Sequence, residues 1–233
     1  MTGTIINAGA IIAGSLIGVF IGARLPEKMR GTVLNGLGLV TSVIGIQMAL
    51  ETKNVLIVLG SLLSGAILGE IMNISDALDR LGRFLQSVTG RGEGSTFSEG
   101  FVTASLIFCV GPMAILGSIQ DGLSGNYQLL AVKSTLDGFA SIAFSASLGW
   151  GVAFSALSIF LFQGSITLFA GVFEKVLTEP MVIEMSATGG IIILGIGLKL
   201  LNLKEIRLAN LLPALVIAPA IVRVLPAVKA FLS

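Results

Sequence analysis

The sequence predicts an all-α membrane protein whose chain crosses the bilayer about eight times, and three observations support this fold class. Hydrophobic residues make up 54% of the 233 residues and charged residues only 12%, about half the share in a soluble domain. So few polar groups cannot cover a water-soluble surface of this size. Long charge-free runs recur, and a helix of roughly 20 apolar residues spans a bilayer. The 30 glycines suit helices that approach closely in lipid.

Eight runs are long and apolar enough to cross: approximately residues 5–23, 32–50, 55–72, 102–119, 129–148, 151–173, 182–201 and 208–224. The stretch 138–173 holds no charge, and as one helix it would measure about 54 Å. That is too long for a single crossing, so a turn is predicted at Gly149-Trp150-Gly151. A count of seven instead of eight would move the C-terminus to the other side of the membrane.

Residues 73–100 are predicted to lie outside the membrane. Their first half has apolar side chains at helical spacing, which predicts a short amphipathic helix on the cytoplasmic face. These side chains are Ile74, Leu78, Leu81, Leu85 and Val88. The glycine-rich residues 89–95 are predicted to be a flexible linker. The helix serves either as a connector, which the sequence favours, or as a docking element for a partner.

The basic residues predict the orientation. When the eight runs alternate sides, nine of the fourteen lysines and arginines fall on one side. They are Arg24, Lys28, Arg30, Arg80, Arg83, Arg91, Lys199, Lys204 and Arg207. This excess marks the cytoplasmic side and places both termini on the opposite, outer side of the membrane.

Three crossings recur as a repeat. Residues 14–17 (GSLI) align with residues 164–167 (GSIT), and the second and third runs then fall on the seventh and eighth. Because five crossings separate the first run from the sixth, the copies would be inverted, as in many secondary transporters. The predicted division is a three-helix repeat (1–72), a cytoplasmic helix and linker (73–100), a central helix pair (101–149) and a second repeat (150–233). A chance match of glycine-rich runs is the alternative.

Two stripes of small residues run along single helical faces. They are Gly14, Gly18 and Gly22 in the first run, and Ser61, Gly65 and Gly69 in the third. Such stripes allow close packing of helix backbones. They serve either as internal seams or as the face of a homo-oligomer, and the sequence leaves both open.

The best candidate for chemistry is Asp137, an ionisable residue inside the fifth run. A charge at the centre of a membrane helix costs about 2.5 to 3.5 kcal/mol on insertion scales. Lys133 lies one turn earlier, where an ion pair could form. At three- and four-residue spacing the same helix carries a small polar stripe that is predicted to face the interior of the bundle or a wet cavity: Ser134, Asp137, Gly138, Ser141 and Ser145. The predicted role of Asp137 is to bind an ion or a proton; a structural Asp137–Lys133 pair is the alternative.

The fourth run contains Gly111-Pro112 at its middle. Proline removes a helical hydrogen bond, and broken membrane helices expose carbonyl groups that bind ions or substrates. The run continues to Asp121, so Gly111, Pro112 and Asp121 join the predicted substrate or ion site.

Uncharged polar residues at membrane depth complete the candidate site: Asn35, Gln163 and Ser165. For each alone, a hydrogen bond between helices is the simpler interpretation. Glu184 lies near the end of a run and is predicted to have no special role.

The sequence excludes several chemistries. A single cysteine and the absence of histidine exclude an internal disulfide, a Cys/His zinc site and a Ser-His-Asp triad. No nucleotide-binding loop is present, and the net charge of +1 gives no reason to expect a nucleic-acid partner. We therefore expect no enzyme activity, no cofactor and no assigned metal site; the expected partners are the lipid bilayer and a small ion or solute.

Three stretches also resemble a known family, the bacterial inner-membrane proteins grouped as domain of unknown function 554. They are residues 14–18 with Leu25-Pro26, the central residues 109–122 (CVGPMAILGSIQDG), and residues 133–138 (KSTLDG). The resemblance covers nearly the whole chain. It implies a polytopic prokaryotic membrane protein, often described as a candidate transporter, but it brings no established substrate and no assigned site residues.

Together these observations favour a secondary transporter of a cation or small solute in the bacterial inner membrane. A membrane scaffold that moves no solute, built on the glycine stripes and the amphipathic helix, is the alternative.

Overall fold

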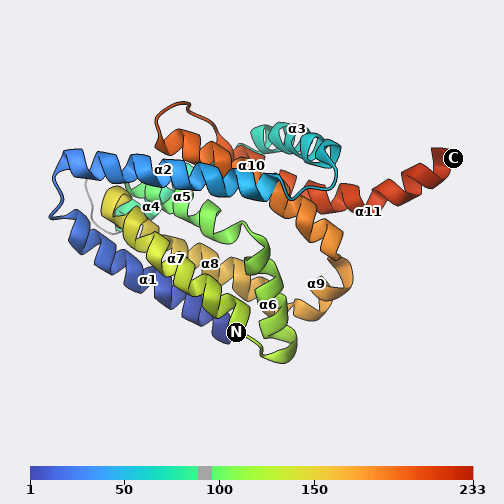
Figure 1. Cartoon of the computed structure of the whole chain (residues 1–233), viewed down its shortest axis with the longest axis horizontal. Coiled ribbons are helices and arrows are strands. Elements are labelled where there is room, and N and C mark those ends of the chain that lie inside the picture. The colour runs from blue at the N-terminus through green and yellow to red at the C-terminus, as the bar shows by residue number, and fades with distance from the viewer. Residues whose placement is uncertain (89–95, 233) are drawn as a thin grey trace.

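A computed structural model describes the backbone of residues 1–88 and 96–232, and side chains of residues 1–87 and 96–225. The described residues form helices and no strands: α1 (Thr2–Gly22), α2 (Glu27–Ala49), α3 (Val55–Ile71), α4 (Ile74–Val88), α5 (Phe97–Cys109), α6 (Pro112–Ser124), α7 (Gln128–Leu148), α8 (Gly151–Leu168), α9 (Ala170–Val176), α10 (Glu179–Leu200), the 3-10 helix η1 (Leu208–Leu211) and α11 (Ala214–Leu232). Figure 1 shows these helices as one elongated bundle. The all-α prediction is confirmed.

Six helices of the described chain are each long and apolar enough to cross a membrane, and two bent pairs raise the number to eight. The bent pairs are α3 with α4, at 58°, and α5 with α6, at 64°. Eight is the predicted number. The turn predicted at residues 149–151 is confirmed, because α7 ends at Leu148, Gly149 has φ of 79° and α8 begins at Gly151.

The first glycine stripe is an internal seam between α1 and α7. Gly14 lies against Gly138 and Ser141, and further along the helix Gly22 lies against Ala146, so the two helices run parallel. A Cβ atom at Gly18 would overlap the carbonyl oxygen of Ile142. The seam therefore depends on the absence of side chains on one face of α1.

The second stripe is also internal. Gly65 packs against Ala214 of α11, and Gly69 packs against Asn210 of η1, so α3 and α11 are antiparallel. Both stripes are thus occupied by contacts within the chain. A homo-oligomer stays a prediction, and in this structure neither stripe is a free face for it.

The α5–α6 pair is a broken span. Val110 is extended, Gly111 has φ of 147°, and Pro112 begins α6. The pair follows α8 along its whole length, because Phe97 of α5 lies beside Gly151 at the start of α8 and Gly122 of α6 lies beside Thr167 near its end. A re-entrant loop would return to the side on which it started. The break predicted at Gly111-Pro112 is confirmed.

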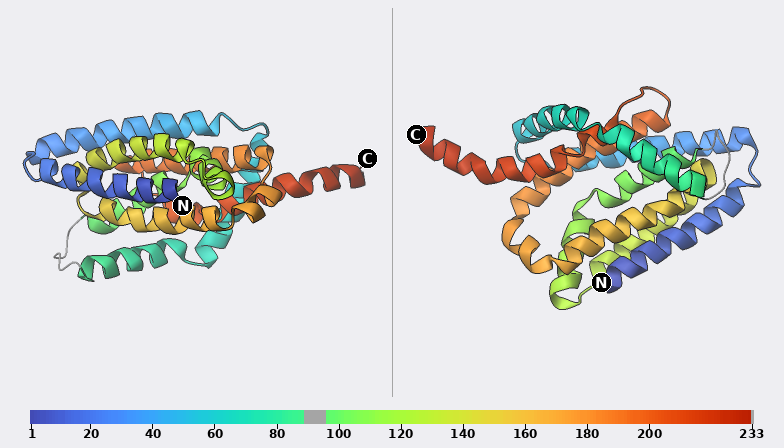
Figure 2. Two further views of the ribbon diagram at one scale, coloured as in Figure 1. Left: turned by 90° about the horizontal axis from the view of Figure 1, so that it is seen from below. Right: turned by 180° about the vertical axis from the view of Figure 1, so that it is seen from behind.

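The helix α4 coincides with the predicted amphipathic helix, and Gly82 of α4 packs against Ser98 of α5. The predicted linker, residues 89–95, lies outside the described residues. In Figure 2, α11 extends beyond the other helices toward the C-terminus.

Three antiparallel pairs join the first half of the chain to the second. Besides α3 and α11, α2 pairs with α10 through Gly45 and Gly190, and α1 meets α8 where Thr4 lies beside Thr167. An inverted repeat would pair these same helices. The repeat and the division into four segments nevertheless stay predictions.

Glu184 of α10 has a structural role that the sequence analysis missed. It is 3% exposed, and its carboxylate accepts hydrogen bonds from Thr52 Oγ1 (2.6 Å), Lys53 N (2.8 Å) and Asn54 N (3.1 Å). These three residues form the turn before α3, so Glu184 fixes the position of α3 relative to α10.

The seam predicts that Gly18→Ala destabilises the protein by about 1 to 3 kcal/mol, because the new methyl group overlaps backbone of α7. The matched control is Gly9→Ala on the same helix, where a Cβ meets nothing within 4 Å. That change should be neutral or slightly stabilising, since alanine favours helix more than glycine. Thermal unfolding of the purified protein in detergent measures both. Equal midpoints for the two variants would contradict the seam.

The Glu184 contacts predict that Glu184→Gln lowers stability by about 1 to 3 kcal/mol, because one acceptor oxygen becomes an NH2 group facing hydrogen-bond donors. Glu179→Gln, on the exposed first turn of the same helix, is the control. The same unfolding measurement should show a lowered midpoint for Glu184→Gln only. A Glu184→Gln midpoint as high as that of the unmodified protein would contradict a stabilising role for the Glu184 hydrogen bonds.

Candidate functional site

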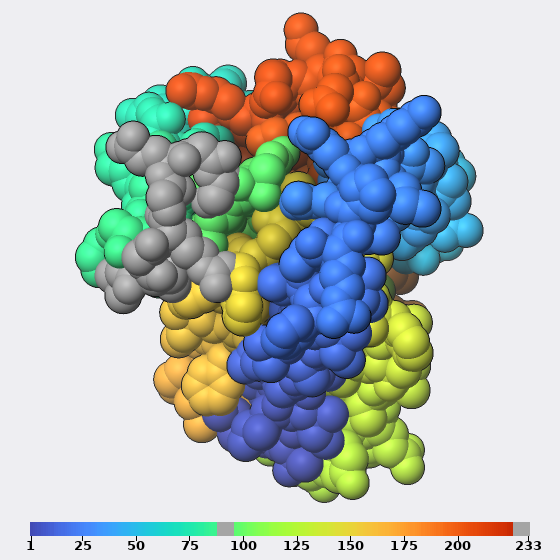
Figure 3. Space-filling model, turned by 90° about the vertical axis from the view of Figure 1, so that its left-hand side faces the viewer, coloured from blue at the N-terminus to red at the C-terminus, as the bar shows by residue number. Residues whose placement is uncertain are grey.

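A network of buried polar side chains lies where α1, α7 and α8 meet. Figure 3 shows α1 between α7 and α8 at this part of the surface. Asp137 and Lys133 on α7 are 8% and 6% exposed and form an ion pair. The amide nitrogen of Asn7 donates to Asp137 Oδ2 (3.0 Å) and to Gln163 Oε1 (3.3 Å). One carboxylate, one ammonium group and two amides thus share one enclosed site.

Local helix geometry explains the ion pair. Residues four apart lie on one face of a helix, so Lys133, Asp137 and Ser141 of α7 are all buried. Asp137 lies near the middle of α7, and the hydroxyl of Ser141 donates to the carbonyl of Gly138 (2.8 Å). The predicted polar stripe on this helix is therefore found on its buried face.

The contact with Asn7 follows from the glycine seam. Because Gly14, Gly18 and Gly22 let α1 approach the backbone of α7, the short Asn7 side chain reaches across to Asp137. Thr4, one turn earlier on α1, lies 3.4 Å from Thr167 of α8 between the two hydroxyl oxygens. The network is continuous across three helices.

Two atoms of this network have no hydrogen-bond partner in the described structure. They are Asn7 Oδ1 and Gln163 Nε2, and both residues are completely buried. Buried polar groups are normally hydrogen-bonded, and leaving one unpaired costs about 1 to 3 kcal/mol. An acceptor and a donor are thus free to bind water, an ion or a polar group beside Asp137.

Asp121 was predicted to join Lys133 and Asp137, and the structure places it differently. Its Oδ2 accepts from the backbone N–H of Gly3 and lies near the amino group of Met1, both at 3.0 Å. Asp121 therefore holds the N-terminus of α1, where the helix dipole favours a negative charge. Asp121 is linked to the network indirectly, because it binds the first residues of α1, the helix that carries Asn7.

Two predicted candidates do not join the network. Asn35 is exposed on α2, and Ser165 is exposed on α8 and donates to the carbonyl of its own helix at Leu161 (2.6 Å). Ser165 points away from the network because of its position on the helix. Gln163 faces inward, and a residue two positions further along an α-helix points to another side. Both side chains therefore lie outside the network around Asp137.

The break in the α5–α6 span lies beside α7, the helix that carries the ion pair. Pro112 has no N–H, so the carbonyl of Phe108 lacks its usual helical donor. The ring of Phe108 packs edge-on against Phe144 of α7. Gly111 and Pro112 thus lie at a discontinuity next to this helix.

Sequence reasoning missed Asn7 and Thr4. Asn7 and Thr4 lie three residues apart, on one face of an otherwise apolar run, and that spacing was the available signal. In the described part of the chain, no three acidic or cysteine residues gather where they could hold a metal ion.

A second polar contact lies at the ends of the spans. Arg207 donates to Glu70 (2.6 Å) and to Asp76 (3.3 Å), and Asn210 donates to Glu70. The hydrogen bond and the negative charge of Glu70 raise the pKa of Arg207, which keeps its positive charge. This cluster joins α3 and α4 to η1.

Comparison with known proteins supports the expected family. The family described as "Protein of unknown function (DUF554)" matches residues 2–223. The chain is 35% identical over 231 residues to the "Uncharacterized membrane protein YdfK" of Bacillus subtilis (strain 168), covering 97% of this chain and 98% of that protein. It is 28% identical over 220 residues to the "Uncharacterized protein YqgA" of Escherichia coli (strain K12), covering 93% and 94%. No solved structure matches. With a family match over nearly its entire length and a relative named as a membrane protein, the chain belongs to the DUF554 family of membrane proteins of unknown function.

Proposed function

We propose that the chain is a secondary transporter of a cation or small solute in the bacterial inner membrane, with Asp137 as the ion or proton site. The observation that carries this proposal is the buried Asp137–Lys133 pair, bound by Asn7, among helices that are apolar on the outside. Both termini would lie in the periplasm, as the basic residues predict.

The free-energy cost of placing two charges in the membrane favours a functional over a purely structural role for this pair. Each charge costs about 2.5 to 3.5 kcal/mol at the centre of a membrane helix. An ion pair between residues four apart on one helix contributes only about 0.2 to 0.5 kcal/mol to helix stability. Lys133 and Asp137 lie on the same helix, so their pairing joins no two parts of the fold. A neutral side chain would serve a purely structural role at lower cost.

The charge balance of the pair suggests a mechanism. With the site empty, the carboxylate of Asp137 neutralises the ammonium group of Lys133. A cation that binds the carboxylate leaves that ammonium group unpaired in a site with little water, which is unfavourable. Lys133 Nζ then releases a proton to solution, and one proton leaves for each cation that enters. Release of the cation reverses both steps.

The broken span supplies the movable element of this mechanism. The half-helices α5 and α6 meet at 64°, and Phe108 beside their junction packs edge-on against Phe144 of α7, the helix that carries the pair. The antiparallel pairs α1 with α8, α2 with α10 and α3 with α11 would form the two inverted halves that rock about the site.

A non-transporting scaffold is the second candidate, and α4 is the observation that favours it. This charged helix leaves Leu81 44% and Phe84 62% exposed, which is a suitable surface for a partner protein. A protein that copurifies with the full-length chain and is lost on Phe84→Ser, together with an absence of ion flux, would favour the scaffold.

The transporter proposal is tested in liposomes that contain the purified protein and a trapped pH-sensitive dye. Addition of Na⁺, K⁺, Mg²⁺ or Mn²⁺ outside should drive protons out through the unmodified protein. Asp137→Asn should reduce this proton movement at least about tenfold, because a neutral amide binds neither the cation nor Lys133. Lys133→Gln should permit cation entry without proton release.

Glu184→Gln is the matched control, since Glu184 is a second buried carboxylate whose contacts are structural. Its proton movement per folded molecule should equal that of the unmodified protein. Full activity and unchanged pH dependence in Asp137→Asn would overturn the mechanism. No proton movement with any of these cations in the unmodified protein would overturn cation–proton exchange itself.

A further inference from the structure

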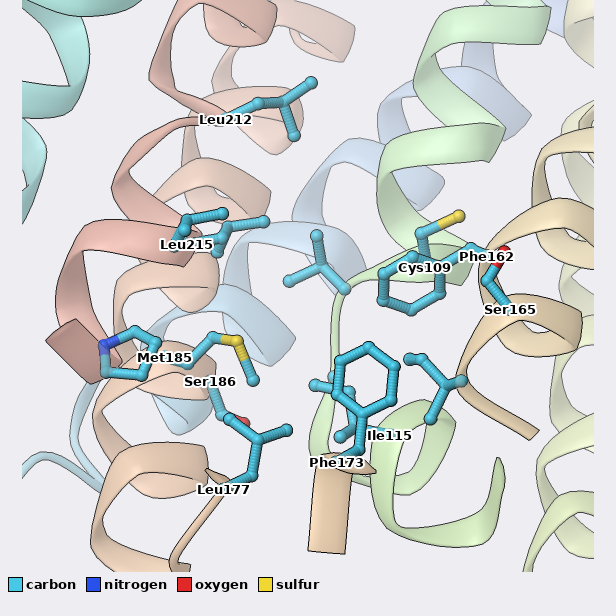
Figure 4. A pocket seen from close by; sticks show the side chains of 15 residues that line it. Cys109, Ile115, Phe162, Ser165, Phe173, Leu177, Met185, Ser186, Leu212 and Leu215 are labelled. Atoms are coloured by element: carbon cyan, nitrogen blue, oxygen red, sulfur yellow. The ribbon is translucent and has the colours of Figure 1, made fainter. Parts of the chain in front are cut away.

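An apolar cavity of about 430 Å³ lies between the α5–α6 break and helices α8, α9, α10 and α11. Figure 4 shows the side chains around it, among them Cys109, Ile115, Phe173, Met185, Ser186 and Leu215. The volume is in the range of pockets that hold small organic ligands.

One polar side chain in this wall lacks a partner. Ser186 of α10 is 2% exposed, and its hydroxyl oxygen has no hydrogen-bond partner in the described structure. Figure 4 shows that oxygen directed into the space beside Leu177. The neighbouring Thr188 behaves as buried helical hydroxyls usually do, because it donates to the carbonyl four residues earlier, at Glu184 (2.8 Å). The hydroxyl of Ser186 is thus free for a ligand.

The cavity opens toward the apolar exterior of the bundle. Three of its lining residues, Phe162 and Ser165 on α8 and Val216 on α11, are exposed. The hydroxyl of Ser165 is already bonded to its own helix. The exterior of membrane helices is lipid, so a molecule that dissolves in the bilayer reaches this opening directly.

The wall also includes the α5–α6 break. Cys109 at the end of α5 and Gly111 of the break both line the cavity. A ligand in the cavity therefore touches the junction of the two half-helices. Apolar walls with one free hydroxyl do not suit a bare ion, which needs several oxygen ligands.

We propose that this cavity binds one small amphipathic organic molecule, with an apolar body against the α8–α11 wall and one hydroxyl or amine group bonded to Ser186. That this molecule is the transported solute rests on the function proposed above. The cation–proton site at Asp137 then supplies the coupling ion, and the cavity supplies the solute site.

Photolabelling tests the site. The probe is octan-1-ol with a diazirine on carbon 3, added to the full chain in phosphatidylcholine vesicles and located by mass spectrometry after irradiation. Adducts on cavity residues such as Met185 and Phe173 should saturate with probe concentration. Unlabelled octan-1-ol should compete, and octane should compete less well. Adducts on the exposed Phe20 of α1 should increase linearly with probe concentration.

Two variants separate binding from simple partition into lipid. Ser186→Ala keeps the cavity but removes the hydroxyl, so it should reduce the preference for octan-1-ol over octane about two- to tenfold, the effect of one hydrogen bond. Leu215→Trp fills the cavity and should abolish saturable labelling. If Leu215→Trp fails to fold, the smaller change Ser186→Ala still tests whether the hydroxyl binds the probe.

The outcomes separate this site from the function proposed above. Saturable labelling without cation–proton exchange overturns the proposed function and keeps the binding site. Exchange without saturable labelling overturns the binding site and keeps the function. Labelling that is unchanged in Ser186→Ala, or a phospholipid acyl chain found in the cavity by native mass spectrometry, also overturns the proposal.

Discussion

The close approach of α1 to α7 is the constraint on which the rest of the structure depends. Gly14, Gly18 and Gly22 present bare backbone to the backbone of α7. With side chains in between, the helices would separate by several ångströms, and Asn7 would no longer reach Asp137. The ion pair would then lose the hydrogen bond that ties it to α1. Packing and chemistry in this protein thus rest on the same three residues.

Features that depend on neighbours along the chain could be predicted from the sequence. The turn at Gly149, the break at Gly111-Pro112 and the Lys133–Asp137 pair involve residues at most four apart, whose geometry a helix fixes. The amphipathic α4 has a periodicity that is visible without tertiary structure.

Features that depend on how a helix is rotated or which helix it meets could not be predicted. Asn7 and Gln163 are 156 positions apart, and only the fold brings them together. No special role was predicted for Glu184, because nothing near it in sequence shows that the turn before α3 lies within reach. Ser165 was included because it is polar, although its position on α8 faces outward.

The order of the helices has a consequence for biosynthesis. The ribosome completes α1 more than a hundred residues before it reaches α7, so α1 enters the membrane long before its partner exists. During that interval Asn7 has no carboxylate to bind, and the bare glycine face of α1 contacts lipid or the insertion machinery. During this interval an uncharged amide costs less free energy in the bilayer than the charge of an aspartate would. The charged members of the network are both on α7, and they emerge together, so neither has to enter the bilayer without the other.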